Sequence, residues 1–285
     1  MTWDAPAASV ENLAHDLQYA AELARGAGKI VMGHWGKVER LTKTHAMTTG
    51  EAVTDADRES QRFIVAGLRR RFEHDGIVGE ENDTGSAITF ECPDPHGRVW
   101  VIDPIDGTNN FVAGLGAFAV CIGLLHRGRP VLGVVYDVAR DQMYTAAQGH
   151  GAWLDNRRLA VSPSPMNDSA MIMLTSNLLD RSGKCPTFCA RWIAQTNWKI
   201  RILGSAALEA IQVAAGVAQA AITLNGKLWD VAAPAAIVQE AGGLVVDLQG
   251  RPIFPFDLRG YTGAKVPFVA TTPAARDVVL DEVAR

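Results

Sequence analysis

The sequence has few cysteines and no long apolar segment, which argues against a disulfide-stabilised protein and against a membrane-spanning one. Its four cysteines do not suggest a disulfide framework, and the two that lie four residues apart have no second pair with which to form a zinc site. No apolar run approaches the roughly 20 residues that cross a bilayer. The first residues also lack the basic start and apolar stretch of a signal peptide. We therefore expect a cytoplasmic protein with reduced thiols and no membrane partner.

A basic surface is also missing. The 27 Lys and Arg residues and the 31 acidic residues give a net charge of −4, and both signs are spread along the chain. The short basic cluster Arg69-Arg70-Arg71 falls at the end of a predicted helix, where the helix dipole favours cations. This distribution predicts no nucleic-acid partner. The chain does have 48% hydrophobic residues among 285, enough for one large domain or two closely packed ones.

The apolar patterns predict an α+β protein in two halves. Residues 1–165 combine packing helices with successive hairpin-like strands, which favours one large, mainly antiparallel sheet. Residues 166–285 alternate strands with helices and predict a smaller α/β layer stacked on the first. The segment 37–53, which includes Lys43, is expected to be a loop or hairpin. Helices are expected at about 7–35, 56–72, 186–195, 204–216, 232–241 and 273–285, and strands at about 77–79, 99–102, 118–125, 131–136, 143–147, 151–154, 170–174, 199–203, 218–224, 244–247 and 266–271.

A short apolar strand that ends in a pair of carboxylates is the most informative part of the chain. The run Val99–Ile102 has the composition of a buried strand. Pro104 has no N–H to give to a sheet, so we expect it to end the strand and to leave Asp103 and Asp106 on a tight turn. A solvated turn is the alternative interpretation, because Asp-Pro and Asp-Gly are common turn pairs.

The two residues after this pair of acids suggest a phosphate site. Gly107 and Thr108 are placed where a helical turn could begin, and the first N–H groups of a helix have no partner within it. Carboxylates hold divalent cations, and such N–H groups hold phosphate oxygens. The combination predicts a place where a metal ion and a phosphate meet.

Further acids occur in comparable settings, each with a structural alternative. The predicted strand 77–79 delivers Glu80 and Glu81, and neighbours in an extended chain point to opposite sides, so only one of them should face a metal. Asp57 lies in the first turn of a predicted helix, where the dipole alone would explain an acid. Asp230 precedes the apolar helix near 232–241 and could be its N-cap.

Four blocks of the sequence together resemble the inositol monophosphatase family, within the superfamily that also holds fructose-1,6-bisphosphatase and the bisphosphate nucleotidases. The blocks occur in the family's order and at family-like spacings, so the resemblance covers nearly the whole chain. They are Val53-Thr54-Asp55-Ala56-Asp57, Gly79-Glu80-Glu81, Asp103-Pro104-Ile105-Asp106-Gly107-Thr108 and Trp229-Asp230-Val231-Ala232-Ala233.

The resemblance implies a fold and a metal centre. The fold would be the layered α/β/α/β/α sandwich of the sugar phosphatases. Glu80, Asp103 and the carbonyl of Ile105 would hold one Mg²⁺, and Asp103 with Asp106 and Asp230 would hold a second. A third, weaker ion could bind near Glu80, so each active site would hold two or three ions. Mn²⁺ would substitute for Mg²⁺, and Ca²⁺ and Li⁺ would inhibit. Hard oxygen ligands of this kind suit Mg²⁺.

The same resemblance assigns the catalytic and substrate-binding residues. Glu80, Asp57 and Thr108 would be catalytic, the last two by orienting the attacking water. The N–H groups of Gly107 and Thr108 would hold the phosphate. The segment Gly204-Ser205-Ala206 would line the alcohol part of the substrate. Glu81 would lie behind the site or in solvent.

Thr223 bears on the choice of substrate. It stands seven positions before Asp230, where inositol-using members of the family carry an acid that binds ring hydroxyls. A neutral residue there argues against inositol phosphate itself. Lys227 could favour an anionic leaving group or could simply be exposed.

These assignments lead to a predicted function. We expect a Mg²⁺-dependent phosphomonoesterase that hydrolyses a small soluble phosphate ester, inositol-phosphate-like or related, with a metal-activated water. Histidinol phosphate phosphatase, 3′(2′),5′-bisphosphate nucleotidase and fructose-bisphosphatase-like activities are the alternatives. A regulatory phosphate- or metal-binding protein of the same fold is the non-enzymatic alternative, and the presence of every expected acid argues against it. The resemblance also implies a homodimer.

Overall fold

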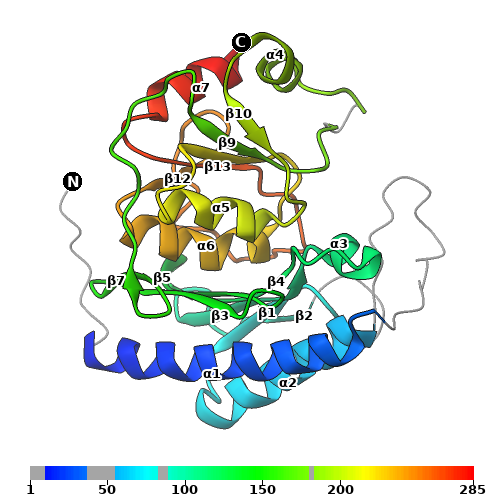
Figure 1. The fold of residues 1–285 in the computed structure, drawn as a ribbon. Coiled ribbons are helices and arrows are strands. Elements are labelled where there is room, and N and C mark those ends of the chain that lie inside the picture. The colour runs from blue at the N-terminus through cyan, green and yellow to red at the C-terminus, as the bar shows by residue number, and fades with distance from the viewer. Residues whose placement is uncertain (1–9, 37–54, 83–88, 180–182) are drawn as a thin grey trace.

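The protein stacks helices and sheets in five layers, which confirms the predicted α+β class and the α/β/α/β/α order (Figure 1). The structure is a computed structural model that describes residues 10–36, 55–82, 89–179 and 183–285. Two long helices lie below a large sheet, two helices fill the centre, and two short helices lie above a second sheet. The loop predicted at 37–53, with Lys43, lies outside the described residues.

The large sheet has eight strands in the order β2-β1-β3-β4-β5-β6-β7-β8. All neighbouring pairs are antiparallel except β1 and β3, which are parallel. The central strands are buried along almost their whole length because helices cover both faces, so their sequences are continuous apolar runs. The strands are β1 (Gly76–Gly79), β2 (Thr89–Glu91), β3 (Arg98–Asp106), β4 (Ala119–His126), β5 (Arg129–Asp137), β6 (Gln142–Ala147), β7 (Gly151–Leu154) and β8 (Arg157–Arg158).

The outer helical layer beside this sheet consists of α1 (Val10–His34) and α2 (Asp55–Arg71). In α1 the buried residues Ala20, Ala24, Ala27 and Val31 recur every three or four positions, so one stripe of the helix faces the core. The helix predictions for this region are confirmed to within a few residues.

The central layer consists of α5 (Ala206–Ala214) and α6 (Leu228–Glu240), and α6 lies unusually close to the large sheet. Gly123 on β4 pairs in register with Gly133 on β5. A Cβ atom on Gly133 would lie 2.2 Å from the carbonyl oxygen of Ala233, and one on Gly123 would lie 2.9 Å from its nitrogen. Two glycines therefore let the backbone of α6 rest directly on the sheet.

The second sheet has five strands in the order β10-β9-β11-β13-β12 and is mixed. The β9–β10 and β9–β11 pairs are parallel, and the two pairs made by β13 are antiparallel. Its outer face is covered by α4 (Thr187–Gln195) and α7 (Arg276–Ala284). The strands are β9 (Met171–Leu174), β10 (Lys199–Arg201), β11 (Ala220–Thr223), β12 (Leu244–Val246) and β13 (Phe268–Thr271).

The structure corrects three predictions about the elements. Pro104 does not end its strand, because β3 continues through Asp106 with an irregularity that accommodates the missing N–H. The helix α6 begins at Leu228, so Asp230 is its third residue and not its N-cap. The short strands β2 and β8 were not predicted, since neither is long or apolar enough to give a periodic signal.

The two predicted halves of the chain pack closely against each other. The helices α5 and α6 belong to the second half of the sequence but pack against strands of the first half, so the two halves share one core cluster. The division at residue 165 stays a prediction.

In the part of the chain that the structure describes, no helix is long and apolar enough to cross a membrane.

Candidate active site

One cavity of about 430 Å³ collects most of the predicted site residues. It lies where the end of β3, the start of α3 (Thr108–Ala113) and the N-terminal ends of α5 and α6 meet. The predicted residues that line it are Glu80, Asp103, Ile105, Asp106, Gly107, Thr108, Gly204, Ala206, Thr223 and Asp230. Segments more than a hundred residues apart in sequence thus form one polar cavity.

A β-bulge in β3 brings Asp103 and Asp106 to the same side of the sheet. In a regular strand, residues three apart point to opposite faces. Here Asp103 pairs with Cys121 and Asp106 pairs with Ala119, so three steps along β3 match two along β4. The extra residue is the bulge, and it redirects the side chain of Asp106. The N–H of Ile105 donates to Oδ1 of Asp103 over 3.0 Å and fixes this local conformation.

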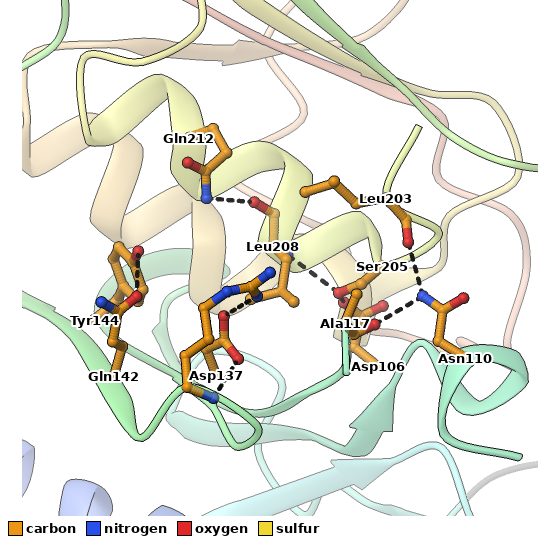
Figure 2. A network of polar contacts seen from close by, with 11 residues as sticks. Asp106, Asn110, Ala117, Asp137, Gln142, Tyr144, Leu203, Ser205, Leu208 and Gln212 are labelled. Carbon is orange, nitrogen blue, oxygen red and sulfur yellow. Dashed lines mark hydrogen bonds and ion pairs between the residues drawn. The ribbon is translucent and has the colours of Figure 1, made fainter. Parts of the chain in front are cut away.

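The N-terminus of α5 holds Asp106. The N–H groups of Ala206 and Ala207 donate to its two carboxylate oxygens over 3.2 and 2.8 Å, and the hydroxyl of Ser205 donates to Oδ2. Ser205 is also the N-cap of α5, because its hydroxyl oxygen accepts the N–H of Leu208 at 3.3 Å. Figure 2 shows Asp106 beside Ser205 at this helix start. Ser205 is 1% exposed and is directed at Asp106.

The loop before α5 is tied to α3 by one side chain. The amide nitrogen of Asn110 donates to the carbonyl oxygens of Ala117 and Leu203, both over 2.7 Å (Figure 2). Gly204 has a left-handed φ of 79°, and a Cβ atom there would lie 3.0 Å from Asn110. Glycine is therefore needed where this loop passes α3.

Asp230 is fixed by the first turn of α6. The backbone N–H of Lys227 donates to Oδ2 of Asp230 over 2.5 Å. The hydroxyl of Tyr261 accepts the N–H of Leu228 at 2.9 Å, and the ring of Tyr261 packs edge-on against Trp229. Trp229 is buried, and the helix start that carries Asp230 is held from two sides.

Three carboxylates form a compact cluster in this cavity. One oxygen atom from each of Asp103, Asp106 and Asp230 lies within 4.8 Å of the others. Burial raises the pKa of all three, and the charge of Glu80 raises the pKa of Asp103 further, well above its ordinary range. The pKa of Asp230 is raised to about 7 by burial and then by Asp106. Buried acids that repel one another in this way suit a divalent cation, whose charge would offset the repulsion.

Glu80 lies at the edge of this cluster. It directly follows β1, and its N–H donates to the carbonyl of Ile102 over 3.2 Å, which extends the β1–β3 pairing by one residue. It lines the cavity but is not one of the three clustered acids. Glu81 is 9% exposed, and Gln61 binds both its N–H and its carbonyl, so it is buried and does not face solvent.

The predicted water-orienting pair is also close together. The hydroxyl of Thr108 lies 2.9 Å from the carbonyl oxygen of Ile105 and 3.4 Å from Oδ1 of Asp57. Asp57 is buried in the first turn of α2 and does not line the cavity. Gly107 has a φ of 90°, and a Cβ atom there would lie 2.9 Å from the carbonyl of Ala117, so no larger residue fits before Thr108.

One residue considered for contact with the substrate does not line the cavity. The ammonium of Lys227 lies 4.9 Å from the centre of the Trp229 ring and is not among the cavity-lining residues. Sequence reasoning also missed residues of three segments, which lie in the first turn of α3 and just after the ends of β9 and β11. They are Asn109, Thr175, Ser176 and Asn177, with Leu179, Asn225 and Gly226 beside them.

The comparisons with known proteins agree with this site. The profile of the inositol monophosphatase family matches residues 12–280. The chain is 38% identical over 235 residues to the fructose-1,6-bisphosphatase/inositol-1-monophosphatase of Thermotoga maritima, covering 82% of this chain and 86% of that protein. It is 35% identical over 238 residues to the histidinol-phosphatase of Chlorobaculum parvum, covering 83% and 87%. A solved structure of the Thermotoga maritima IMPase superposes with a TM-score of 0.80 at 34% identity, covering 95% and 97%.

An acidic cavity between two sheets, in this five-layer fold, defines the chain as a phosphomonoesterase. It belongs to the inositol monophosphatase family, as its sequence blocks predicted. The family is metal-dependent, and the cluster of Asp103, Asp106 and Asp230 provides a set of oxygen ligands that could bind a metal ion.

Proposed function

We propose that the protein hydrolyses a small soluble phosphate ester with the help of Mg²⁺. The observation that carries this proposal is the cluster of Asp103, Asp106 and Asp230, whose carboxylates converge within 4.8 Å in a polar cavity. Two of these acids are buried, and the pKa of each is raised by burial. Such a cluster without a cation is electrostatically unfavourable, so it supports a role as a metal site.

The proposed metal ligands follow from the positions of the acids. The charges of Glu80, Asp106 and Asp230 all raise the pKa of Asp103, so this carboxylate would be a ligand to both Mg²⁺ ions. Glu80 and the carbonyl of Ile105 would complete one ion's protein ligands, and Asp106 with Asp230 the other's. Bound Mg²⁺ would lower the pKa of the attacking water and offset the charge on the departing oxygen.

The remaining residues would position the reacting groups. Thr108 would bind the attacking water through its hydroxyl, and Asp57, 3.4 Å away, would accept the water's proton through that hydroxyl. The new P–O bond to water would form as the P–O bond to the alcohol breaks, and the departing alkoxide would take a proton from solvent water. The N–H groups of Gly107 and Thr108 would hold the phosphate oxygens at the start of α3. Gly204, Ser205 and Ala206 would line the alcohol side, with Ser205 acting through Asp106.

Thr223 supports a substrate other than inositol phosphate. It is 2% exposed, lines the cavity, and its hydroxyl oxygen has no hydrogen-bond partner in the described part of the chain. A single neutral hydroxyl there can bind one polar group of the alcohol but contributes no charge. Histidinol phosphate, a nucleotide bisphosphate and sugar phosphates such as fructose bisphosphate therefore stand ahead of inositol phosphate.

Several finer properties belong to the same proposal. We expect two to three Mg²⁺ ions per site, activity with Mn²⁺, and inhibition by Ca²⁺ and Li⁺. We also expect a cytoplasmic homodimer that has no nucleic-acid partner. Light scattering would test the dimer, and titration of the activity with Li⁺ would test the weak cation site.

The decisive experiment measures phosphate release from a panel of esters with Mg²⁺ and with excess chelator. The panel contains inositol-1-phosphate, histidinol phosphate, fructose-1,6-bisphosphate, adenosine 3′,5′-bisphosphate and NADP. We expect metal-dependent release from one of them, and we expect Asp103→Asn to lose at least 100-fold in kcat while its circular dichroism is unchanged. Asp168→Asn, an exposed acid outside the cavity, is the matched control. Full activity in chelator, or near-normal turnover by Asp103→Asn, would refute the proposal.

A further inference from the structure

A second cavity, larger than the catalytic one, lies next to it and shares the lining residue Asn225. Its volume is about 710 Å³, within the range of small-molecule sites. Much of its lining is apolar and comes from Phe188, Leu224, Leu248 and Pro267, of which Phe188 and Leu224 are buried side chains. The cavity is thus a formed concave site with an apolar floor, and none of the four acids of the catalytic cavity lines it.

The two charged side chains that line this cavity are both cations. Lys265 and Arg285 line it, and among its described lining residues there is no acid. Arg285 already pairs with Glu282 over 2.8 Å. Lys265 forms no ion pair with any carboxylate of the described residues, and its ammonium donates to Oδ1 of Asn225. An ammonium has three N–H donors, so Lys265 keeps the capacity to bind an anion.

The wall between the two cavities is the chain that leaves β11. Thr223 lines the catalytic cavity, the next residue Leu224 lines the second cavity, and Asn225 lines both. The strand β11 ends at Thr223 and the chain bends at Leu224 and Asn225, so neighbouring residues reach different cavities. Gly226, also in the catalytic cavity, accepts the N–H of Val266 at its carbonyl over 2.6 Å, beside Lys265.

Asn225 connects the two cavities through hydrogen bonds. Its Oδ1 accepts from Lys265, and its amide nitrogen donates to the carbonyl oxygens of Asn177 and Leu179 over 2.9 and 3.0 Å. Asn177 and Leu179 both line the catalytic cavity. A change in the hydrogen bond between Lys265 and Asn225 can therefore alter the position of residues that line the catalytic cavity.

We propose that the second cavity is a binding site for a small amphipathic anion. The apolar body of the ligand packs on Phe188, Leu224 and Leu248, and its single anionic group binds Lys265. The bound anion competes with Oδ1 of Asn225 for the ammonium of Lys265, and this competition alters the hold of Asn225 on the segment that contains Asn177. The binding site is independent of the proposed function, and only its effect on catalysis rests on that function.

The test uses 8-anilinonaphthalene-1-sulfonate, an aromatic monoanion of suitable size, and the full folded chain. Fluorescence titration is expected to give one site per chain. Lys265→Gln is expected to raise the Kd at least fivefold. Ala284→Trp, at an exposed position that lines the cavity, is expected to weaken binding because the new ring occupies part of the cavity. Lys199→Gln, an exposed lysine on β10 outside both cavities, is the matched control and should leave the Kd unchanged.

The outcomes separate this site from the proposed function. Equal Kd values for all the variants, or the absence of a saturable site in the unaltered chain, would overturn the proposal. With the best ester of the panel, saturating probe is expected to change KM at least twofold in the unaltered chain but not in Lys265→Gln. An unchanged KM despite specific binding would overturn the coupling. Specific binding with no phosphate release from any ester would count against the proposed function and leave the second site standing.

Discussion

At the scale of single residues, the catalytic cavity depends on side chains that orient the acids. Asp106 is held by the hydroxyl of Ser205 and by two N–H groups at the start of α5. Glu209, one turn further along α5, accepts the N–H groups of Leu203 and Gly204 with one oxygen over 2.8 and 3.0 Å. The loop that lines the cavity is therefore fixed from both of its ends by α5.

Replacing Ser205 should weaken metal binding more than folding. Ser205→Ala removes the N-cap of α5, which costs about 1 kcal/mol of stability, and also removes a hydrogen bond that orients Asp106. Loss of such an outer partner lowers metal affinity by roughly 10- to 100-fold. Calorimetric titration with Mg²⁺ measures the affinity, and thermal unfolding measures the stability. The exposed Ser164→Ala is the control, and an unchanged Mg²⁺ affinity in Ser205→Ala would contradict the role assigned to Ser205.

Glu209 should make stability fall as the pH rises. Burial raises the pKa of its carboxyl to about 8, and its second oxygen has no hydrogen-bond partner in the described part of the chain. An acid whose pKa is higher in the folded state binds more protons there, so its favourable contribution is lost as the pH rises from about 4.5 toward 8.

The comparison with Glu209→Gln isolates this effect from the other acids. Gln can accept the same two N–H groups but does not ionise, so its variant should lack this part of the pH dependence. Between pH 5 and pH 9 the unaltered chain should lose roughly 4 kcal/mol of unfolding free energy relative to the variant. Urea unfolding at both pH values, in excess chelator, measures the difference. A difference below about 1 kcal/mol would show that Glu209 does not remain protonated when folded.

At the scale of elements, the distance between α6 and the large sheet decides where Asp230 lies. The helix rests on Gly123 and Gly133, where any side chain would collide with the backbone of Ala233. Two strand glycines therefore place an acid three residues before Ala233 beside the acids of β3. The bulge in β3 makes the matching adjustment from the other side of the site.

Adding one methyl group at Gly133 should separate these elements. The new Cβ atom would lie 2.2 Å from a carbonyl oxygen, so α6 must move away from the sheet. We expect Gly133→Ala to lower stability by about 1–3 kcal/mol and to lower kcat about 100-fold, since a misplacement of ~1 Å has that effect on catalysis. Thermal unfolding and phosphate release measure the two effects.

Gly33 provides the matched control for this substitution. It lies in α1, and a Cβ atom there would have no neighbour within 4 Å. Gly33→Ala should therefore be neutral or stabilising by about 0.5–1 kcal/mol, with normal activity. Similar behaviour of the two variants would contradict the argument that α6 requires a glycine at position 133.

At the scale of the whole molecule, the catalytic cavity joins three of the five layers. Its acids come from the large sheet and from α6 of the central layer, and Thr223 comes from the second sheet. The second cavity shares the wall that ends at Asn225 and opens toward the outer helices. A ligand in either cavity therefore contacts more than one layer.

Metal binding should accordingly stabilise the entire fold. A ligand at 100 times its Kd adds about 2.7 kcal/mol of stability when it binds only the folded state. We expect Mg²⁺ to raise the Tm of the unaltered chain and excess chelator to reverse the shift, with NaCl at equal ionic strength as the control. Asp103→Asn should show little or no shift. An equal shift in that variant would mean that Mg²⁺ stabilises the protein elsewhere.

Local sequence patterns predicted the candidate site residues and the order of most helices and strands. The acids, the Gly107–Thr108 step and the apolar periodicity are local properties, and the resemblance linked them to a family. The tertiary structure alone decided which side chains meet, because that depends on pairing between distant segments. The register of β3 against β4 decides whether Asp106 shares a face with Asp103. The prediction that Pro104 ends the strand was wrong because the bulge in this register lets β3 continue past it. The second cavity and its wall at Asn225 likewise exist only where separate layers pack together.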